Sequence, residues 1–221
     1  MPIDPEHTLA ALVLERPARS RTFEELGLDY CCGGNRSLTD ACAAVGVDLD
    51  ATLARLEAAS EEPDGEPDWQ RVPLEELIDH IVSVHHDGMR QELPRLDGLL
   101  AKVVRAHGDE EPQLRELRAT FVSLRAELEE HMSDEEERLF PLCRSGEPLD
   151  PRHVEELEDE HVSTGQALGQ LRALTRDYDL GVARCNTHRA TIDGLRELEV
   201  DLHRHIHEEN NVLFPRALTA A

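Results

Sequence analysis

The chain has 221 residues, enough for one large domain or two modest ones. It carries 47 acidic and 23 basic residues, a formal net charge of −24, and residues 1–66 alone hold 14 acidic and 5 basic residues. This charge argues against nucleic acid and anionic membranes as partners. Aromatic residues make up only 3%, and the helix formers Ala, Leu, Glu and Arg dominate, which predicts an all-α fold.

The N-terminus has neither the basic segment nor the long apolar core of a signal peptide. No apolar run approaches the roughly 18 residues that a membrane-spanning helix needs. We therefore expect a soluble cytoplasmic protein. In that compartment the five cysteines are expected to be reduced thiols.

The pattern of residues 1–60 predicts a small helical domain. Short amphipathic segments predict helices from Thr8 to Glu15, around Phe23 to Leu28, after Ser37 as an N-cap, and from Leu49 to Ala59. The sequence Asp29-Tyr30-Cys31-Cys32-Gly33-Gly34 forms a loop near its centre. Residues 61–72 begin with an acidic stretch rich in Pro and Gly and are interpreted as a linker.

Four long helical patterns occupy residues 73–219. They begin at Pro73, at about Gln113, at Asp150-Pro151 and at about Asn186. The third is expected to end at about Tyr178, and Pro94 predicts a kink in the first. Short loops between long helices favour antiparallel neighbours, so the pattern predicts an up-down four-helix bundle.

A repeat within this bundle carries the chemistry. The segment from His131 to Pro141 recurs 74 residues later, from His205 to Pro215, and His, Glu, Leu, Phe and Pro match at five of eleven positions. In both copies the Glu follows the His by four residues, at Glu135 and Glu209, so each pair lies on one helix face.

Helix periodicity places both pairs on apolar, core-facing stripes. A buried ionised carboxylate is costly unless it is paired or bound to a metal. By the same periodicity Asp134, Glu137, His207 and Glu208 point away, and we interpret them as a solvated face.

The other two long helices also supply histidine. His161 lies on the stripe of the third helix. In the first helix His85 and His86 are adjacent, and ideal periodicity slightly favours His85. The spacing from His86 to His161 is 75 residues, close to the repeat, and favours His86. Six further histidines are interpreted as ordinary core or surface residues: His80, His107, His153, His188, His203 and His207.

Four histidines and two glutamates form a mixed nitrogen and oxygen ligand set. For two metal ions, two histidines each plus two bridging glutamates give four protein ligands per ion. A solvent bridge makes five, which leaves an octahedral ion such as iron one open position. A closed structural zinc site would favour thiolates, and no cysteine lies on these stripes.

With these motifs the chain resembles the repair-of-iron-centres proteins, which are di-iron proteins of the hemerythrin-like class. The resemblance spans nearly the whole chain. It is carried by Asp29 to Gly34, by Ile78-Asp79-His80-Ile81 leading to His86, by His131 to Pro141, by Glu160-His161, and by His205 to Pro215.

The resemblance implies a non-haem centre of two iron ions with an oxo or hydroxo bridge. Its implied ligands are His86, His131, Glu135, His161, His205 and Glu209. It also implies the repair of iron–sulfur clusters damaged by nitric oxide or peroxide, with iron donation as the route and damaged iron–sulfur proteins as clients. An oxygen-carrying hemerythrin would have an aspartate five residues after a histidine, where this chain has Asn210 after His205. Reversible oxygen transport is therefore disfavoured.

Cys31 and Cys32 are the candidates for redox chemistry or iron transfer. A position near a helix start would favour the thiolate form. Two thiols are too few for an iron–sulfur cluster, which takes four ligands, but a homodimer would bring four together. A tight turn with buried thiols is the structural alternative.

Three functions are therefore open: cluster repair, an oxidoreductase that reduces nitric oxide, and a sensor or store that binds O2, NO or iron. The cysteine domain favours repair, because a gas-binding bundle would not need it.

Overall fold

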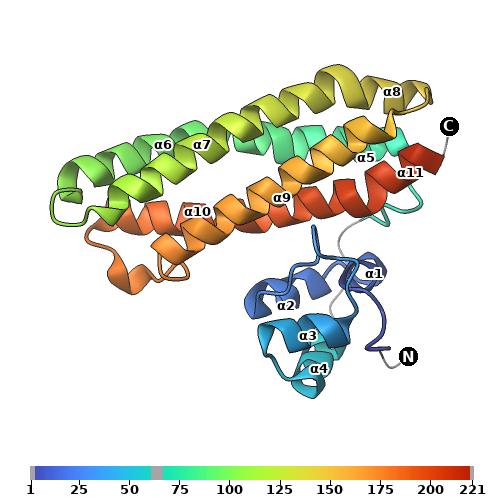
Figure 1. Ribbon diagram of the computed structural model, residues 1–221, viewed down its shortest axis with the longest axis horizontal. Helices are drawn as coiled ribbons and strands as arrows, with labels where there is room; N and C mark the ends of the chain where they lie inside the picture. The colour runs from blue at the N-terminus through green and yellow to red at the C-terminus, as the bar shows by residue number, and fades with distance from the viewer. Residues whose placement is uncertain (1–2, 61–66, 220–221) are drawn as a thin grey trace. The chain divides into compact units, whose positions relative to one another are not determined.

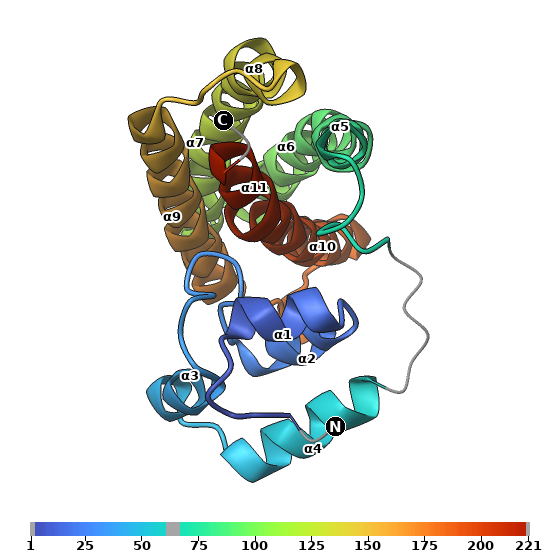
Figure 2. The same cartoon turned by 90° about the vertical axis from the view of Figure 1, so that its right-hand side faces the viewer.

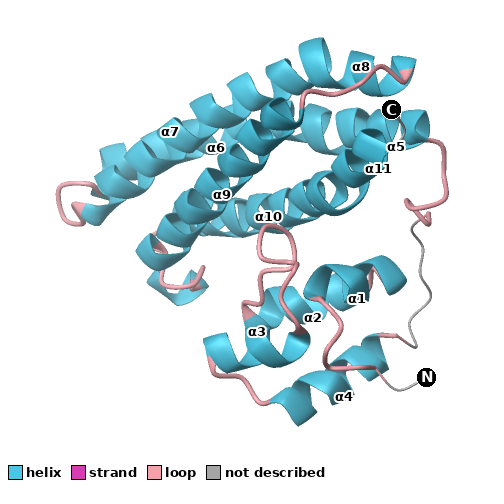
Figure 3. Ribbon diagram, turned by 45° about the vertical axis from the view of Figure 1, so that its right-hand side comes forward, coloured by secondary structure: helices cyan, strands magenta, loops and turns pink. Residues whose placement is uncertain are grey.

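The computed structural model describes residues 3–60 and 67–219; the first part of the predicted linker, residues 61–66, lies outside the described residues. Within these ranges all regular structure is helical, apart from an isolated β-bridge between Thr8 and Ser37 (Figure 3). The all-α prediction is confirmed. None of the described helices is long and apolar enough to cross a membrane.

The described residues divide into two compact units. The first comprises residues 3–60, 67–77 and 203–219, and the second comprises residues 78–202. Helix α10 (Asn186–Glu208) contributes to both, because the division falls after Leu202.

Residues 3–60 of the first unit form four short helices: α1 (Leu9–Glu15), α2 (Arg19–Leu26), α3 (Leu38–Val45) and α4 (Leu49–Ala59) (Figure 2). The side chains of Thr8, Ser37 and Asp48 accept hydrogen bonds from the backbone three residues on, which caps three of these helices. Gly27 ends α2 in the left-handed conformation, with φ 66°. The small core is formed by Leu9, Leu12, Phe23, Tyr30, Leu38 and Leu56.

The four predicted helical patterns appear in the predicted order, three of them divided into shorter pieces. The pieces are α5 (Leu74–His80), α6 (Asp87–His107), α7 (Gln113–Asp134), α8 (Phe140–Ser145), α9 (Pro151–Leu174), α10 and α11 (Phe214–Thr219). In the second unit α6, α7, α9 and α10 as far as Leu202 run in alternating directions (Figure 1). Their shared core includes Leu93, Leu100, Phe121, Leu128, Leu168, Leu171, Leu195 and Leu202.

Three π-helical segments interrupt the long helices: η1 (Ile81–His86), η2 (Glu135–Leu139) and η4 (Glu209–Leu213). A π turn holds more residues than an α turn, and such segments often occur at functional sites. Each of these segments contains one of the predicted ligands. A π turn also shifts the buried face by about one residue, which explains why ideal α-helical periodicity favoured His85 over His86.

The third long helix ends earlier than predicted. Helix α9 stops at Leu174, where Thr175 donates its hydroxyl to the backbone oxygen of Leu171 at 2.8 Å. Arg176, Asp177 and Tyr178 then adopt positive φ angles of 53°, 60° and 55°. This turn returns the Tyr178 side chain to the bundle core. A short 3₁₀ turn, η3 (Leu180–Val182), precedes α10.

Candidate metal centre

Glu135, the first residue of η2, has a fully buried carboxylate. Its Oε2 atom lies 3.4 Å from Nε2 of His86 and 3.4 Å from Nε2 of His131. Neither carboxylate oxygen has a hydrogen-bond partner among the described residues. A bare carboxylate in a protein interior costs several kcal/mol. The arrangement fits a cation held between the carboxylate and the two imidazoles.

His161, on α9, completes a cluster of nitrogen and oxygen ligands in the second unit. Its Nε2 atom lies 3.0 Å from Nε2 of His131, and both rings are buried. Two imidazole nitrogens at this distance share either a proton or a cation. Imidazole and carboxylate together are donors that suit iron and other transition metals.

Two glutamates fix the orientation of two of these imidazoles. Glu136 accepts a hydrogen bond from Nδ1 of His86 at 2.7 Å, and Glu160 accepts one from Nδ1 of His131 at 2.7 Å. A proton on Nδ1 leaves Nε2 as the atom available to a metal, an arrangement typical of metal-binding histidines. Helix periodicity does not predict these roles, although both glutamates adjoin candidate ligands in the sequence.

Electrostatics keeps these two glutamates ionised. Burial by itself would raise the pKa of Glu136, but hydrogen bonds from His86 and Arg90 hold the pKa below its ordinary value. The hydrogen bond from His131 lowers the pKa of Glu160. Both carboxylates therefore remain acceptors at neutral pH.

The second copy of the repeat lies in the first unit, at the end of α10 and the start of η4. His205 and Glu209 are both buried, and Nε2 of His205 lies 2.8 Å from Oε1 of Glu209. The predicted four-residue spacing therefore brings this His and Glu together within one helix turn, as it does for His131 and Glu135.

The structure distinguishes the adjacent histidines of η1. His86 lies beside Glu135, whereas Nδ1 of His85 lies 2.8 Å from Oδ1 of Asp201 on α10. The two side chains therefore contact different groups in the second unit, and His86 is the one that adjoins the buried carboxylate.

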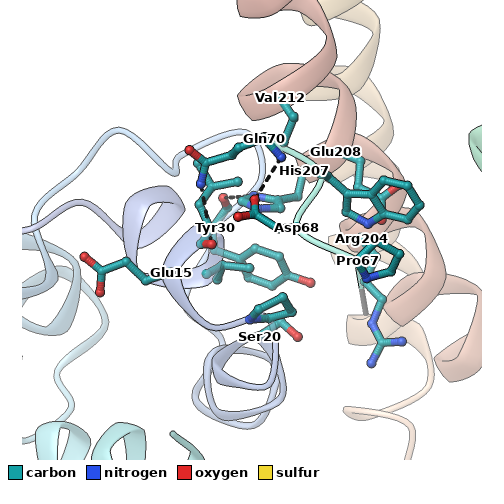
Figure 4. A pocket seen from close by; sticks show the side chains of 14 residues that line it. Glu15, Ser20, Tyr30, Pro67, Asp68, Gln70, Arg204, His207, Glu208 and Val212 are labelled. Atoms are coloured by element: carbon teal, nitrogen blue, oxygen red, sulfur yellow. Dashed lines mark hydrogen bonds between the residues drawn. The ribbon is translucent and has the colours of Figure 1, made fainter. Parts of the chain in front are cut away.

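The prediction of a solvated face was wrong for His207 and Glu208, which are only 6% and 7% exposed. In the first unit the His207 ring packs 5.4 Å from the ring of Tyr30, and its Nδ1 lies 3.3 Å from the backbone oxygen of Tyr30. Both residues line a cavity of about 260 Å³ beside α1 and α10 (Figure 4). Burial lowers the pKa of His207 to about 4. The periodicity of one helix cannot reveal burial by another segment of the chain.

The cysteine loop is organised by Asp29. Its Oδ1 accepts hydrogen bonds from the backbone N–H groups of Cys31 and Cys32 at 3.1 and 3.0 Å, and its Oδ2 accepts one from Gly33 at 2.9 Å. A side chain on Gly34 would collide with the backbone oxygen of Tyr30, so this tight turn requires glycine.

The two thiols are adjacent, with their sulfur atoms 3.8 Å apart. The hydrogen bond to Cys32, followed by burial, raises the pKa of Cys31 well above its ordinary value. The expectation of a thiolate near a helix start is therefore wrong for Cys31: the loop ends before α3, and the carboxylate of Asp29 disfavours a second negative charge. Cys31 is a buried thiol and Cys32 is half-buried.

Comparisons with known proteins agree with this architecture. Residues 77–217 match the hemerythrin HHE cation binding domain, and residues 5–60 match ScdA_N, a domain of unknown function. The iron–sulfur cluster repair protein YtfE of Yersinia pseudotuberculosis serotype O:1b (strain IP 31758) is 40% identical over 214 residues, covering 96% of each chain. YtfE of Yersinia pestis (strain Pestoides F) has the same identity and coverage.

The first match defines a hemerythrin-like protein with buried histidine and glutamate clusters that suit iron. The chain belongs to the family of the iron–sulfur cluster repair proteins, and in this chain the ScdA_N match precedes the hemerythrin match. The resemblance found in the sequence is confirmed.

Proposed function

We propose that the protein holds two iron ions and uses this centre to repair iron–sulfur clusters damaged by nitrosative or oxidative stress. The proposed ligands are His86, His131, Glu135, His161, His205 and Glu209. The observation that carries the proposal is Glu135, whose buried carboxylate lies 3.4 Å from two imidazole nitrogens without a hydrogen bond from a described residue.

The chain's own residues prepare this site for a cation. Glu136 and Glu160 hold the protons of His86 and His131 on Nδ1, so that Nε2 of each ring is turned toward Glu135 or His161. Glu135 and Glu209 supply the negative charge, in the role of bridging ligands. When bound, iron would supply a redox-active cation with an open position for a small ligand such as NO or O2.

The proposed clients are damaged iron–sulfur proteins, and the proposed route is iron donation. Two features support this function. The relatives in Yersinia are named iron–sulfur cluster repair proteins. In addition, the sulfur atoms of Cys31 and Cys32 lie 3.8 Å apart in the first unit, close enough to act together in redox chemistry or iron transfer once Cys31 has lost its proton.

The test is anaerobic repair of a client. A protein with a [4Fe–4S] cluster is damaged with nitric oxide and mixed with the iron-loaded protein, and cluster absorbance is followed. We expect recovery with wild type and with Glu137→Gln, which changes an exposed residue of the same π segment. Glu135→Gln should abolish recovery.

Equal recovery with an equivalent amount of free ferrous iron would contradict a specific role in repair. Steady consumption of nitric oxide with a reductant, without recovery of the client, would instead favour the oxidoreductase.

A further inference from the structure

His85 has the geometry of a metal ligand, although it does not adjoin Glu135. It is 3% exposed, and its Nδ1–H group donates to Oδ1 of Asp201 at 2.8 Å. The same pairing of Nδ1 with a carboxylate holds His86 on Glu136 and His131 on Glu160. In each case the carboxylate fixes the proton on Nδ1 and orients Nε2 as the donor.

A second imidazole faces His85 within the same unit. His80 ends α5, and η1 follows directly, so His80 and His85 are five residues apart across a π turn. Residues five apart lie one turn apart in π geometry. The ring centroids are 5.4 Å apart with an interplanar angle of 86°, and a nitrogen atom of each ring lies within 4.8 Å of one on the other.

An acidic cavity of about 210 Å³ lies beside Asp201, the carboxylate that contacts His85. Its lining includes the carboxylates of Glu92, Glu197 and Asp201, contributed by α6 and α10. Asp201 is 37% exposed, and it contacts His85 as well as lining the cavity. Three carboxylates around one cavity raise the local concentration of cations.

We propose that His80 and His85 bind one divalent transition-metal ion at a site separate from the six proposed ligands. Asp201 orients His85, and the acidic cavity beside Asp201 favours cations near this part of the unit. Imidazole nitrogens suit ferrous iron and its neighbours in the first row. Within the described residues of this unit the proposed ligands are these two imidazoles, so solvent would complete the coordination and the ion would exchange readily.

Ferrous iron is the natural occupant if the protein handles iron, and this assignment of the occupant rests on the proposed function. The site itself depends only on the geometry of His80, His85 and Asp201. His85 directly precedes the proposed ligand His86 in the sequence. An exchangeable ion at His80 and His85 would therefore occupy an intermediate binding site for iron that moves to or from the buried ligands.

The test is titration of the full-length, iron-containing protein with Co²⁺ under anaerobic conditions, followed by equilibrium dialysis and by the visible absorption of bound cobalt. Wild type should bind one Co²⁺ per chain more than His85→Gln or His80→Gln. His153→Gln is the matched control, because His153 also pairs with a carboxylate, that of Asp134, in the same unit. It should retain the additional cobalt.

Equal cobalt binding by wild type and both variants would overturn the proposal, and so would loss of the original iron from His85→Gln. The test compares the number of cobalt ions bound by wild type and by each variant. Cobalt that enters an unfilled main centre would be counted in both, so the difference of one ion remains. A wild-type protein without iron would contradict the proposed function alone, because the difference of one cobalt ion would still be measured.

Discussion

Asn211 donates its side-chain N–H to the backbone oxygen of Cys31 at 3.2 Å, and it lies two residues after Glu209. Two residues before Glu209, His207 contacts the backbone oxygen of Tyr30 at 3.3 Å. The two side chains that flank the candidate ligand Glu209 in the sequence therefore hold the cysteine loop in place. Both contacts use backbone oxygens, so they hold the loop whatever the chemical state of the thiols.

Removal of the Asn211 side chain should therefore loosen the loop. In Asn211→Ala we expect Cys31 to be alkylated several times faster by iodoacetamide, because this buried thiol becomes more accessible. Iron content should not change. Mass spectrometry of the modified peptide measures the rate, and Asn35→Ala, at an exposed position in the same loop, is the control. An unchanged alkylation rate at Cys31 would show that Asn211 does not hold the loop.

The adjacent histidines of η1 should differ in their effect on iron. His86→Ala should lose one or both irons, because His86 adjoins Glu135. His85→Ala should keep both, because its imidazole is directed to Asp201. Iron is measured per chain after purification. If His85→Ala loses iron and His86→Ala does not, the assignment of the first ligand is wrong by one residue.

Iron should stabilise the bundle. A ligand present at a thousandfold excess over its Kd stabilises the folded state by about 4 kcal/mol. In a protein of this size that raises the melting temperature by several degrees. We expect the iron-loaded wild type to melt clearly above the apoprotein in thermal unfolding.

The substitution Glu135→Gln removes the negative charge of this side chain and nearly preserves its size. Glu135→Gln should weaken iron binding and cost the apoprotein little, because a neutral amide is cheaper to bury than a carboxylate. Thermal unfolding with and without iron should therefore show a smaller difference than in wild type, and Glu137→Gln should behave like wild type. Coincident melting of apo and iron-loaded wild type would argue against Glu135 as a ligand.

The burial of His188 should make the folded protein less stable in acid. Burial lowers its pKa below the ordinary value of 6.5, and its Nδ1 atom accepts a hydrogen bond from the backbone of Arg184 at 3.3 Å. As pH falls through 6.5 the unfolded chain takes up the proton first, so this contribution to stability declines. The apoprotein of His188→Asn should lose less melting temperature between pH 7 and pH 5 than wild type. Parallel declines would show that His188 does not contribute.

Much of the fold could be predicted from local patterns. Helix α4 begins and ends where its apolar spacing predicts, from Leu49 to Ala59, and Ser37 caps α3 as expected. These features depend on neighbouring residues alone. The four-residue spacing of His131 and Glu135 likewise survives because an α-turn sets it.

The remaining features depend on contacts that local periodicity does not encode. The π segments shift the face that carries His86, and they are seen only in the folded backbone. The burial of His207 arises from Tyr30, which is 177 residues away in the sequence. The pKa of Cys31 is raised by Cys32 and by burial, although a position near a helix start would favour the thiolate form.

The most direct test of the central claim is metal analysis of the full-length protein purified without added metal, combined with its absorption spectrum. Two buried His–Glu pairs and two further buried histidines predict close to two irons per chain and the near-ultraviolet band of an oxo-bridged ferric pair. One zinc per chain without iron would contradict the account, because the residues assigned to a di-iron centre would then hold a different metal.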